Sequence, residues 1–268
     1  MARAVRHLLL LGSWFFGMWY LLSRIDFIDL FEIEQLTKDN ERRLGKLVLG
    51  AIRTGHEELA ADSITQYIED VKNRICESNG LADSSIILHI IAQHDVNAFA
   101  LPGRHLVVYS HLLAYCQSPE ELAGVLSHEI AHIENRHVMH KLAKEVGVMM
   151  LMTIAGGESG STILKETARI LSSTAFDRDQ ESQADASAVQ YMAKAGIDPE
   201  HLATLLFRLS RENATMPEYL EFLSTHPNAS DRAAEIMRLR KSQEFTPRPI
   251  SSDSEWTSLQ QRVAQAGE

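Results

Sequence analysis

Apolar residues recur at the spacing of an amphipathic helix in five stretches of this chain. In the first stretch, Ile64, Ile68, Val71 and Ile75 lie three or four positions apart, and Asn79-Gly80 then provides a stop signal. The same period returns further along the chain. The predicted helices cover residues 63–76, 118–133, 179–192, 201–208 and 252–266.

The second predicted helix has a well-defined start. Ser118 supplies the N-cap, Pro119 takes the first helical position, and Glu121 can reach back to the cap. The apolar stripe that follows consists of Leu122, Val125, Leu126, Ile130 and Ile133. This stripe predicts that at least one wall of the helix is buried.

Continuous apolar runs at residues 85–91 and 106–109 predict two short strands. Between them, residues 97–103 end in a Pro102-Gly103 turn. We expect these segments to form a small antiparallel sheet beside helix 118–133. An exposed edge of that sheet could pair with an extended peptide through main-chain hydrogen bonds, although a plain sheet core explains the same residues equally well. The candidate edge residues are Asn97, Ala98, Phe99 and Ala100.

The first 24 residues have the pattern of a membrane segment. Arg3 and Arg6 precede an uncharged, aromatic-rich run at residues 8–22, and acidic residues follow it. No small-residue cleavage site is evident, so we expect an uncleaved signal-anchor in the inner membrane, with the rest of the chain on the periplasmic side. A cleaved signal, which would leave a soluble periplasmic protein, and a buried N-terminal helix are the alternatives.

Changes in composition and Pro- or Gly-containing segments divide the remaining chain into three parts. We expect a helical lead-in at residues 25–58, a main domain at 59–242, and a Pro-containing linker with a terminal helix at 243–268. Residues 146–155 are apolar but too short to span a bilayer. They are expected to form a core helix followed by a surface loop, or alternatively a mobile lid or membrane-contacting flap.

Charge and cysteine content narrow the class of protein. Lys and Arg number 26 and Asp and Glu number 36, which gives a net charge of −10. An acidic chain without a basic patch is a poor candidate for nucleic-acid binding. Cys76 and Cys116 could form a disulfide in an oxidising compartment or remain as buried thiols. The oligomeric state cannot be read from this pattern.

The residues with recognisable chemistry are His128-Glu129-Ile130-Ala131-His132, within the second helix. Residues four apart share a helix face, so His128 and His132 can hold one metal ion. Glu129 is close enough to reach a water molecule at that metal and to act as a general base. Two solvated histidines on a polar face are the alternative, but unpaired rings on a partly buried wall would be costly.

A catalytic zinc site uses three protein ligands and one open position. The metzincin pattern needs His at position 138, but this chain has Val138, so the third ligand must come from elsewhere. Glu181 is the candidate. Asp185, on the same helix face, could accept the second ring N–H of His128. Alone, this acidic pair could equally be the first turn of an ordinary helix.

Four motifs in this order resemble those of the HtpX-like gluzincin endopeptidases, which include the CAAX prenyl protease type. They are H-E-I-A-H at 128–132, E-S-Q-A-D at 181–185, N-A-F-A-L-P-G at 97–103, and S-T-H-P at 224–227 with Asp231-Arg232. The resemblance covers about residues 60–240. It is greatest to the periplasmic branch with BepA and LoiP, because HtpX carries internal membrane helices that this pattern lacks. Arg104 stands where a second Gly is usual.

The resemblance implies an α+β, mainly helical, zincin-type domain behind an N-terminal membrane helix, and a zinc-dependent endopeptidase with one Zn²⁺ per chain. It places His226 by the zinc, where it could donate to the oxyanion or occupy the open metal position. It gives Arg232 an orienting role. It also implies polypeptide substrates, namely misfolded or misassembled envelope proteins. Two rivals are a chaperone or scaffold of the same fold with a plugged, weakly active metal site, and a zinc hydrolase of small amides.

Overall fold

The computed structural model of the chain describes residues 37–59, 62–81, 85–156, 160–212 and 221–266, together with Trp14 and Gly17. The membrane segment expected at residues 1–24 therefore lies outside the described residues except at those two positions. Most of the expected lead-in before residue 37 lies outside them as well. Within the described part of the chain, no helix combines the length and the apolar character that a bilayer span requires.

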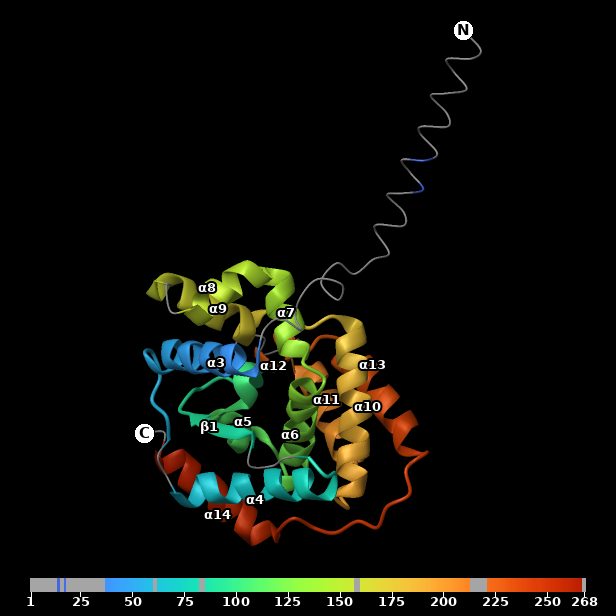
Figure 1. Ribbon diagram of the computed structural model, residues 1–268. Helices are drawn as coiled ribbons and strands as arrows, with labels where there is room; N and C mark the ends of the chain where they lie inside the picture. Colours follow the sequence, from blue (N-terminus) through green and yellow to red (C-terminus); the bar gives the residue numbers. More distant parts are fainter. Residues whose placement is uncertain are drawn as a thin grey trace, which may run out of the picture.

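Helices make up most of the described chain (Figure 1). The five predicted helices are confirmed as α4, α6, α10, α11 and α14, with ends that differ by a few residues. The helices are α3 (Lys38–Arg53), α4 (Asp62–Ser78), α5 (Ser110–Tyr115), α6 (Pro119–Glu134), α7 (His137–Val146), α8 (Val148–Gly156), α9 (Ser161–Ser173), α10 (Arg178–Lys194), α11 (Glu200–Glu212), α12 (Glu221–Thr225), α13 (Ala229–Arg240) and α14 (Asp253–Ala266).

The sheet is mixed, and the prediction of an antiparallel sheet was wrong for one of its two pairings. Its strands β1 (Ile87–Ile91), β2 (Ala98–Leu101) and β3 (His105–Tyr109) lie in the order β1-β3-β2. Strand β2 turns through η3 (Pro102–Arg104) and pairs antiparallel with β3, whereas β1 pairs with β3 in parallel. Because β2 is the hairpin partner of β3, β1 pairs with the other side of β3. It runs in the same direction as β3.

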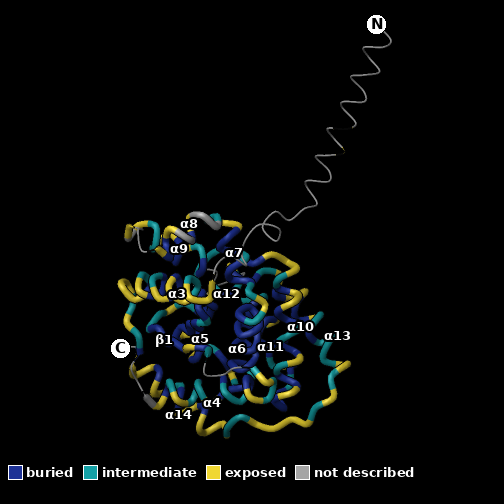
Figure 2. Tube along the Cα trace, in the orientation of Figure 1, coloured by how far each residue is buried: buried dark blue, intermediate teal, exposed yellow. Residues whose placement is uncertain are grey.

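Helix α6 runs through the centre of the molecule and packs against α10, α11 and β2 (Figure 1). Ser118 accepts a hydrogen bond from the N–H of Glu121, as a cap should, and Pro119 opens the helix. The Glu121 carboxylate accepts from the N–H of Gln117 rather than from the cap residue. Every residue from Leu122 to Ile133 is buried, so the helix is a core element on all sides (Figure 2).

Helix α3 packs tightly against η3, and glycines permit this contact. A Cβ on Gly45 would lie 2.0 Å from the carbonyl oxygen of Pro102. Gly103 has a φ of 72° and Arg104 a φ of 65°, both in the left-handed region. The second value explains why glycine is usual at position 104, and the guanidinium of Arg104 is held by an ion pair with Glu134.

The apolar stretch at 146–155 forms α8, which packs against α3 and α7. Leu151, Ile154 and Ala155 are buried, which agrees with a core helix. The loop predicted at 156–161 falls partly outside the described residues. A role as a lid or membrane-contacting flap stays a prediction.

The C-terminal segment crosses the surface and returns to the domain. Arg74 donates hydrogen bonds to the carbonyls of Ala195, Arg248 and Pro249, which fastens the predicted linker. Beyond it, α14 packs against α4 and α5. Cys76 and Cys116 are both buried thiols and form no disulfide.

Candidate metal centre

Two turns of α6 place the rings of His128 and His132 side by side. Their Nε2 atoms lie 3.0 Å apart, and both side chains are fully buried. The spacing follows from the helix, since residues four apart occupy one face. Two imidazole nitrogens are therefore aimed at a common point, as the sequence pattern predicts.

Helix α10 brings a carboxylate to the same point. Its start is fixed by a capping box, in which Asp177 accepts from the N–H of Gln180 and Gln180 accepts from the N–H of Asp177. One turn in, Glu181 places Oε1 3.4 Å from Nε2 of His132 and Oε2 3.6 Å from Nε2 of His128. The structure thus brings the three predicted ligand residues together.

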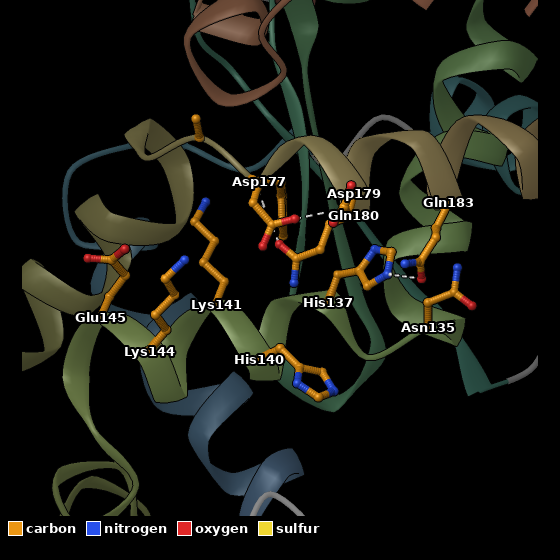
Figure 3. A pocket seen from close by; sticks show the side chains of 12 residues that line it. Asn135, His137, His140, Lys141, Lys144, Glu145, Asp177, Asp179, Gln180 and Gln183 are labelled. Carbon is orange, nitrogen blue, oxygen red and sulfur yellow. Dashed lines mark hydrogen bonds between the residues drawn. The ribbon is translucent and has the colours of Figure 1, made fainter. Parts of the chain in front are cut away.

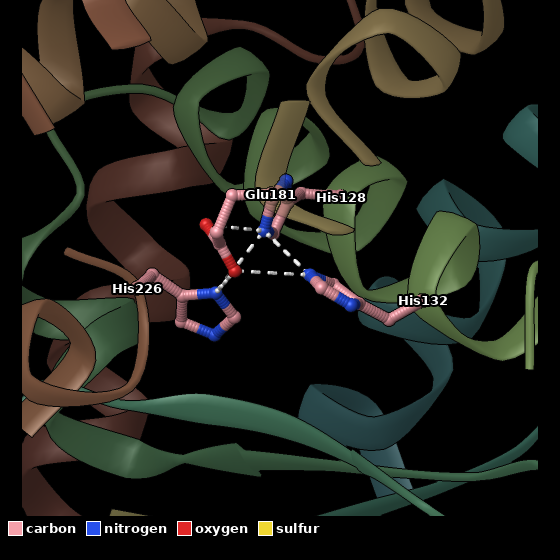
Figure 4. A group of neighbouring side chains, drawn as sticks. All are labelled: His128, His132, Glu181 and His226. Carbon is pink, nitrogen blue, oxygen red and sulfur yellow. Dashed lines mark hydrogen bonds and ion pairs between the residues drawn. The ribbon is translucent and has the colours of Figure 1, made fainter. Parts of the chain in front are cut away.

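His226 completes the group from the loop between α12 and α13. Its Nδ1 lies 2.8 Å from Oε1 of Glu181 and 3.2 Å from Nε2 of His128. The ring stacks with those of Phe222 and Phe176, with centroid distances of 4.5 Å and 5.6 Å. Each of the four residues offers one ligand atom, and all four atoms lie within 4.8 Å of one another (Figure 4).

The donor set and its spacing fit a divalent metal ion. A tetrahedral ion with bonds of about 2.0–2.1 Å separates its ligand atoms by roughly 3.3 Å. The three separations among His128, His132 and Glu181 fall between 3.0 Å and 3.6 Å. Imidazole nitrogen with carboxylate oxygen suits zinc and several neighbouring first-row metals.

Glu129 lies at the same centre, on the side of β2. The backbone N–H of Ala100 donates to Oε2 of Glu129 over 3.1 Å, and Oε1 lies 3.3 Å from Nε2 of His226. Among the described residues, that carboxylate oxygen and that ring nitrogen have no hydrogen-bond partner although both are buried. Buried polar atoms normally have hydrogen-bond partners, so these two atoms are the ones that a bound molecule would be expected to contact.

Arg232 and Asp185 contact two of the predicted ligand residues, His128 and Glu181. Oδ1 of Asp185 lies 3.0 Å from Nδ1 of His128, the distance expected of an acceptor that fixes the tautomer of a ligand. Arg232 binds both oxygens of Asp185 at 2.8 Å each and places Nη1 2.5 Å from Oε2 of Glu181. Both residues are buried. They contact the predicted ligand residues His128 and Glu181, as is expected of orienting groups.

Burial and neighbouring charge set the protonation of these groups in opposite directions. Burial raises the pKa of Glu129, and the Glu181 carboxylate raises it further. Burial would also raise the pKa of Glu181, but His226 and Arg232 outweigh it and hold that pKa well below the usual value. Burial lowers the pKa of His132 well below normal and that of His226 to about 4, which favours neutral rings with lone pairs for a metal.

The predicted edge residues form β2 and the residue before it. Strand β2 is an edge of the sheet, but Ala98, Phe99 and Ala100 are buried, because α9 and α6 pack against the strand. The side-chain amide of Asn97 donates to the carbonyl of Ser172 at the end of α9 and to the carboxylate of Glu221. The edge of β2 therefore lies beside Glu129, and α6 and α9 cover its residues in this structure.

Two residues at the centre were not predicted. Nδ1 of His137 lies 3.0 Å from Nδ1 of His132, and the ring of Phe176 packs 4.0 Å from the His132 ring. His137 does not share a helix with His132, because Arg136, at a φ of 56°, ends one helix and starts the next. Helical spacing alone could not predict this contact. The only hint in the sequence was that His137 follows the predicted ligand His132 by five residues.

Comparison with known proteins identifies relatives along most of the chain. The beta-barrel assembly-enhancing protease of Yersinia pestis is 26% identical over 243 residues, which is 85% of this chain and 49% of the relative. The Escherichia coli K12 protein of the same name is 24% identical over 236 residues, 82% of this chain and 47% of the relative. Mitochondrial metalloendopeptidase OMA1 of Schizosaccharomyces pombe is 33% identical over 188 residues, 68% of this chain and 53% of the relative.

This chain thus spans about half the length of the curated relatives it matches. The family model that matches is described as Peptidase family M48, and the match covers residues 62–240. That range contains all of the candidate ligand, base and orienting residues described above. It also agrees with the resemblance drawn from the four motifs, which is confirmed. The chain belongs to peptidase family M48.

Proposed function

We propose that this protein is a zinc-dependent endopeptidase. The observation that carries the proposal is the convergence of His128, His132 and Glu181, from two helices, on one point beside Glu129. Two imidazoles and a carboxylate are a standard ligand set of catalytic zinc, and a neighbouring carboxylate is its usual base. Membership of a peptidase family supports the same reaction.

Zinc at this point would lower the pKa of a water molecule and polarise the peptide carbonyl. Glu129 then does the proton transfer. The N–H of Ala100 holds its Oε2, which leaves Oε1 to take a proton from water and pass it to the leaving amide nitrogen. Arg232 and Asp185 keep the ligand residues in place and take no proton.

His226 occupies the fourth corner of the ligand group in the proposed resting form. Its Nδ1 is as close to Glu181 and His128 as those ligands are to each other. A substrate carbonyl needs that position, so His226 must move aside before cleavage. This supports the reading in which His226 fills the open metal position over the one in which it donates to the oxyanion.

We further propose polypeptide substrates that bind as an extra strand on β2, beside Glu129, once the residues of α6 and α9 that cover this edge are displaced. The names of the relatives, a beta-barrel assembly-enhancing protease and a mitochondrial metalloendopeptidase, support work on proteins of a cell envelope or organelle. Misfolded or misassembled envelope proteins are the proposed class. The charge pattern before residue 24 supports a periplasmic catalytic domain on an inner-membrane anchor.

A second candidate is a chaperone or scaffold with a weakly active metal site. It is favoured by the burial of the centre: the four candidate ligand residues are at most 2% exposed, and the rings of Phe176 and Phe222 stack on His226. In that case protein binding, not cleavage, would be the main activity. Both candidates use the same fold and are separated by the variant below.

The test is Glu129→Gln in the full chain, compared with Glu134→Gln on the same helix. The amide keeps an acceptor for the N–H of Ala100 but cannot accept the proton, so cleavage of casein should fall by at least about a hundredfold while zinc content stays at wild type. Glu134 lies outside the centre, in an ion pair with Arg104, and its variant should cleave normally. Undiminished cleavage by Glu129→Gln would refute the assignment. Retained client binding without cleavage in the wild type would favour the chaperone.

Metal ligation by Glu181 has its own test. Glu181→Ala should lose most of its zinc, measured by mass spectrometry of the purified protein, because two histidines alone hold zinc weakly. Ser182→Ala changes the next residue, which is exposed, and should keep its zinc. Equal zinc in the two variants would remove Glu181 from the ligand set.

A further inference from the structure

A polar cavity of about 520 Å³ lies beside the metal centre, between α7 and the start of α10 (Figure 3). His137 and Phe176 line it, and both also contact His132. The cavity is thus separated from a predicted metal ligand by one layer of side chains. This adjacency is the reason to ask whether a substrate side chain next to the cleaved bond binds in this space.

The floor of the cavity is buried and its rim is exposed. His137, Lys141 and Phe176 form the buried part. The charged rim residues are Lys144, Glu145, Asp177 and Asp179, all exposed. Solvent and salt screen the charges of the rim, so they contribute little to binding. The ammonium of Lys141, in a region of lower dielectric, dominates the electrostatics of the floor.

Lys141 is held in place but can still serve a ligand. It donates to the carbonyl of Thr174, and its Nζ lies 4.3 Å from the centroid of Phe176. Burial lowers the pKa of Lys141 to about 8, against the opposing effect of Glu129 and Glu181, so the group stays mainly protonated at neutral pH. An ammonium has three donors, and one goes to Thr174, which leaves donors for an acceptor in the cavity.

We propose that this cavity is a substrate subsite that binds an acidic side chain, with Lys141 as its specificity-determining residue. Lys141 offers a charge-assisted hydrogen bond to the carboxylate of a glutamate. A chain advances at most about 3.5 Å per residue, so residues near the scissile bond are the positions to vary. The inference rests on the proposed endopeptidase function.

The test uses the zinc-loaded full chain and a set of matched peptides. One peptide that the wild type cleaves is varied so that glutamate, then glutamine, occupies each position within three residues of the scissile bond. At one position we expect kcat/KM to favour glutamate over glutamine by roughly tenfold or more, mainly through KM. Lys141→Gln should remove that preference. Because Lys141 also acts electrostatically on Glu129, the readout is the ratio of kcat/KM for the two peptides within the variant, not its absolute rate.

Two further variants keep the result interpretable. Lys141→Arg retains the charge and should retain the preference even if Lys141→Gln folds poorly. Lys144→Met removes an exposed lysine of the same helix and should change the preference less than twofold. Absence of any glutamate preference in the wild type, or its survival in Lys141→Gln, overturns the subsite. If zinc-loaded wild type cleaves no peptide at all, the proposed endopeptidase function fails first and the subsite falls with it.

Discussion

Removing either partner of the buried Arg232–Asp185 pair should strongly destabilise the protein. Two nitrogens of Arg232 each lie 2.8 Å from an oxygen of Asp185, and a third contacts Glu181. Loss of one partner leaves the other as an unpaired buried charge, which costs about 3–5 kcal/mol. We expect Arg232→Met and Asp185→Asn each to lower the free energy of unfolding of the metal-free protein by about that amount. Arg232→Met should be the worse of the two, because it also leaves Glu181 without its guanidinium.

The double variant shows whether the two losses share one cause. With Asn at 185, the Arg232 side chain has lost its main partner, so its removal leaves less charge uncompensated. We therefore expect the double variant to cost about 2–3 kcal/mol less than the sum of the single variants. This shortfall is the free energy of coupling between the two side chains.

The assay is urea unfolding of the four proteins in the presence of a chelator, followed by far-UV circular dichroism. A matched control is offered by Arg178 and Asp231, an exposed pair 3.9 Å apart on neighbouring helices. Arg178→Met should cost less than about 1 kcal/mol, because solvent screens an exposed pair. If the losses at Arg232 and Asp185 add to within about 0.5 kcal/mol, the two side chains are not coupled and the reasoning is wrong.

Three more predictions follow from single positions. His226→Ala should keep its zinc and cleave casein at least as fast as wild type, because it opens the fourth corner; a hundredfold loss would instead identify an oxyanion donor. Gly45→Ala should lower the free energy of unfolding, measured in urea, by about 2 kcal/mol, because its Cβ would lie 2.0 Å from the Pro102 carbonyl oxygen. Gly50→Ala, on the same helix, has open space around its Cβ and should raise that free energy by up to about 1 kcal/mol. Burial lowers the pKa of His105 to about 4, so as pH falls from about 7 to about 4 the unfolded state protonates this ring before the folded state does. The free energy of unfolding should therefore decrease over that pH range, and decrease less steeply in His105→Leu.

Local patterns predicted the helices and most of the centre, because a helix converts sequence spacing into spatial position. His128 with His132, and Glu181 with Asp185, are each four residues apart, and each pair shares a face in the structure. The apolar stripe around the histidines correctly indicated burial. What spacing could not give was the approach of α10 to α6, which depends on packing between segments some fifty residues apart. The motif resemblance supplied that step.

The direction of β1 is a different kind of error. The side chains of a buried strand look the same in a parallel and an antiparallel pair, so residues 85–91 carry no signal of direction. The decisive feature was the turn at Pro102-Gly103, which makes β2 and β3 a hairpin and leaves β1 the outer side of β3.

His226 shows the limit of spacing arguments most clearly. It lies in a loop, 98 residues from His128, and reaches the centre because the N–H of Phe222 bonds to the carbonyl of Val96 and the N–H of Phe176 bonds to that of Thr225. These tertiary hydrogen bonds have no periodic signature. Only the S-T-H-P motif indicated the residue, and nothing local indicated Phe176.

The charge balance of the buried cluster gives an independent reason to expect a metal ion there. Glu129, Glu181 and Asp185 are each at most 2% exposed, and Arg232 is the cation that binds two of them directly. Buried charge without compensation is costly, and burial and the Glu181 carboxylate both raise the pKa of Glu129. A divalent ion between the Nε2 atoms of the two α6 histidines would add positive charge beside the same carboxylates. The electrostatics of the cluster therefore favour the ion that the ligand geometry accommodates.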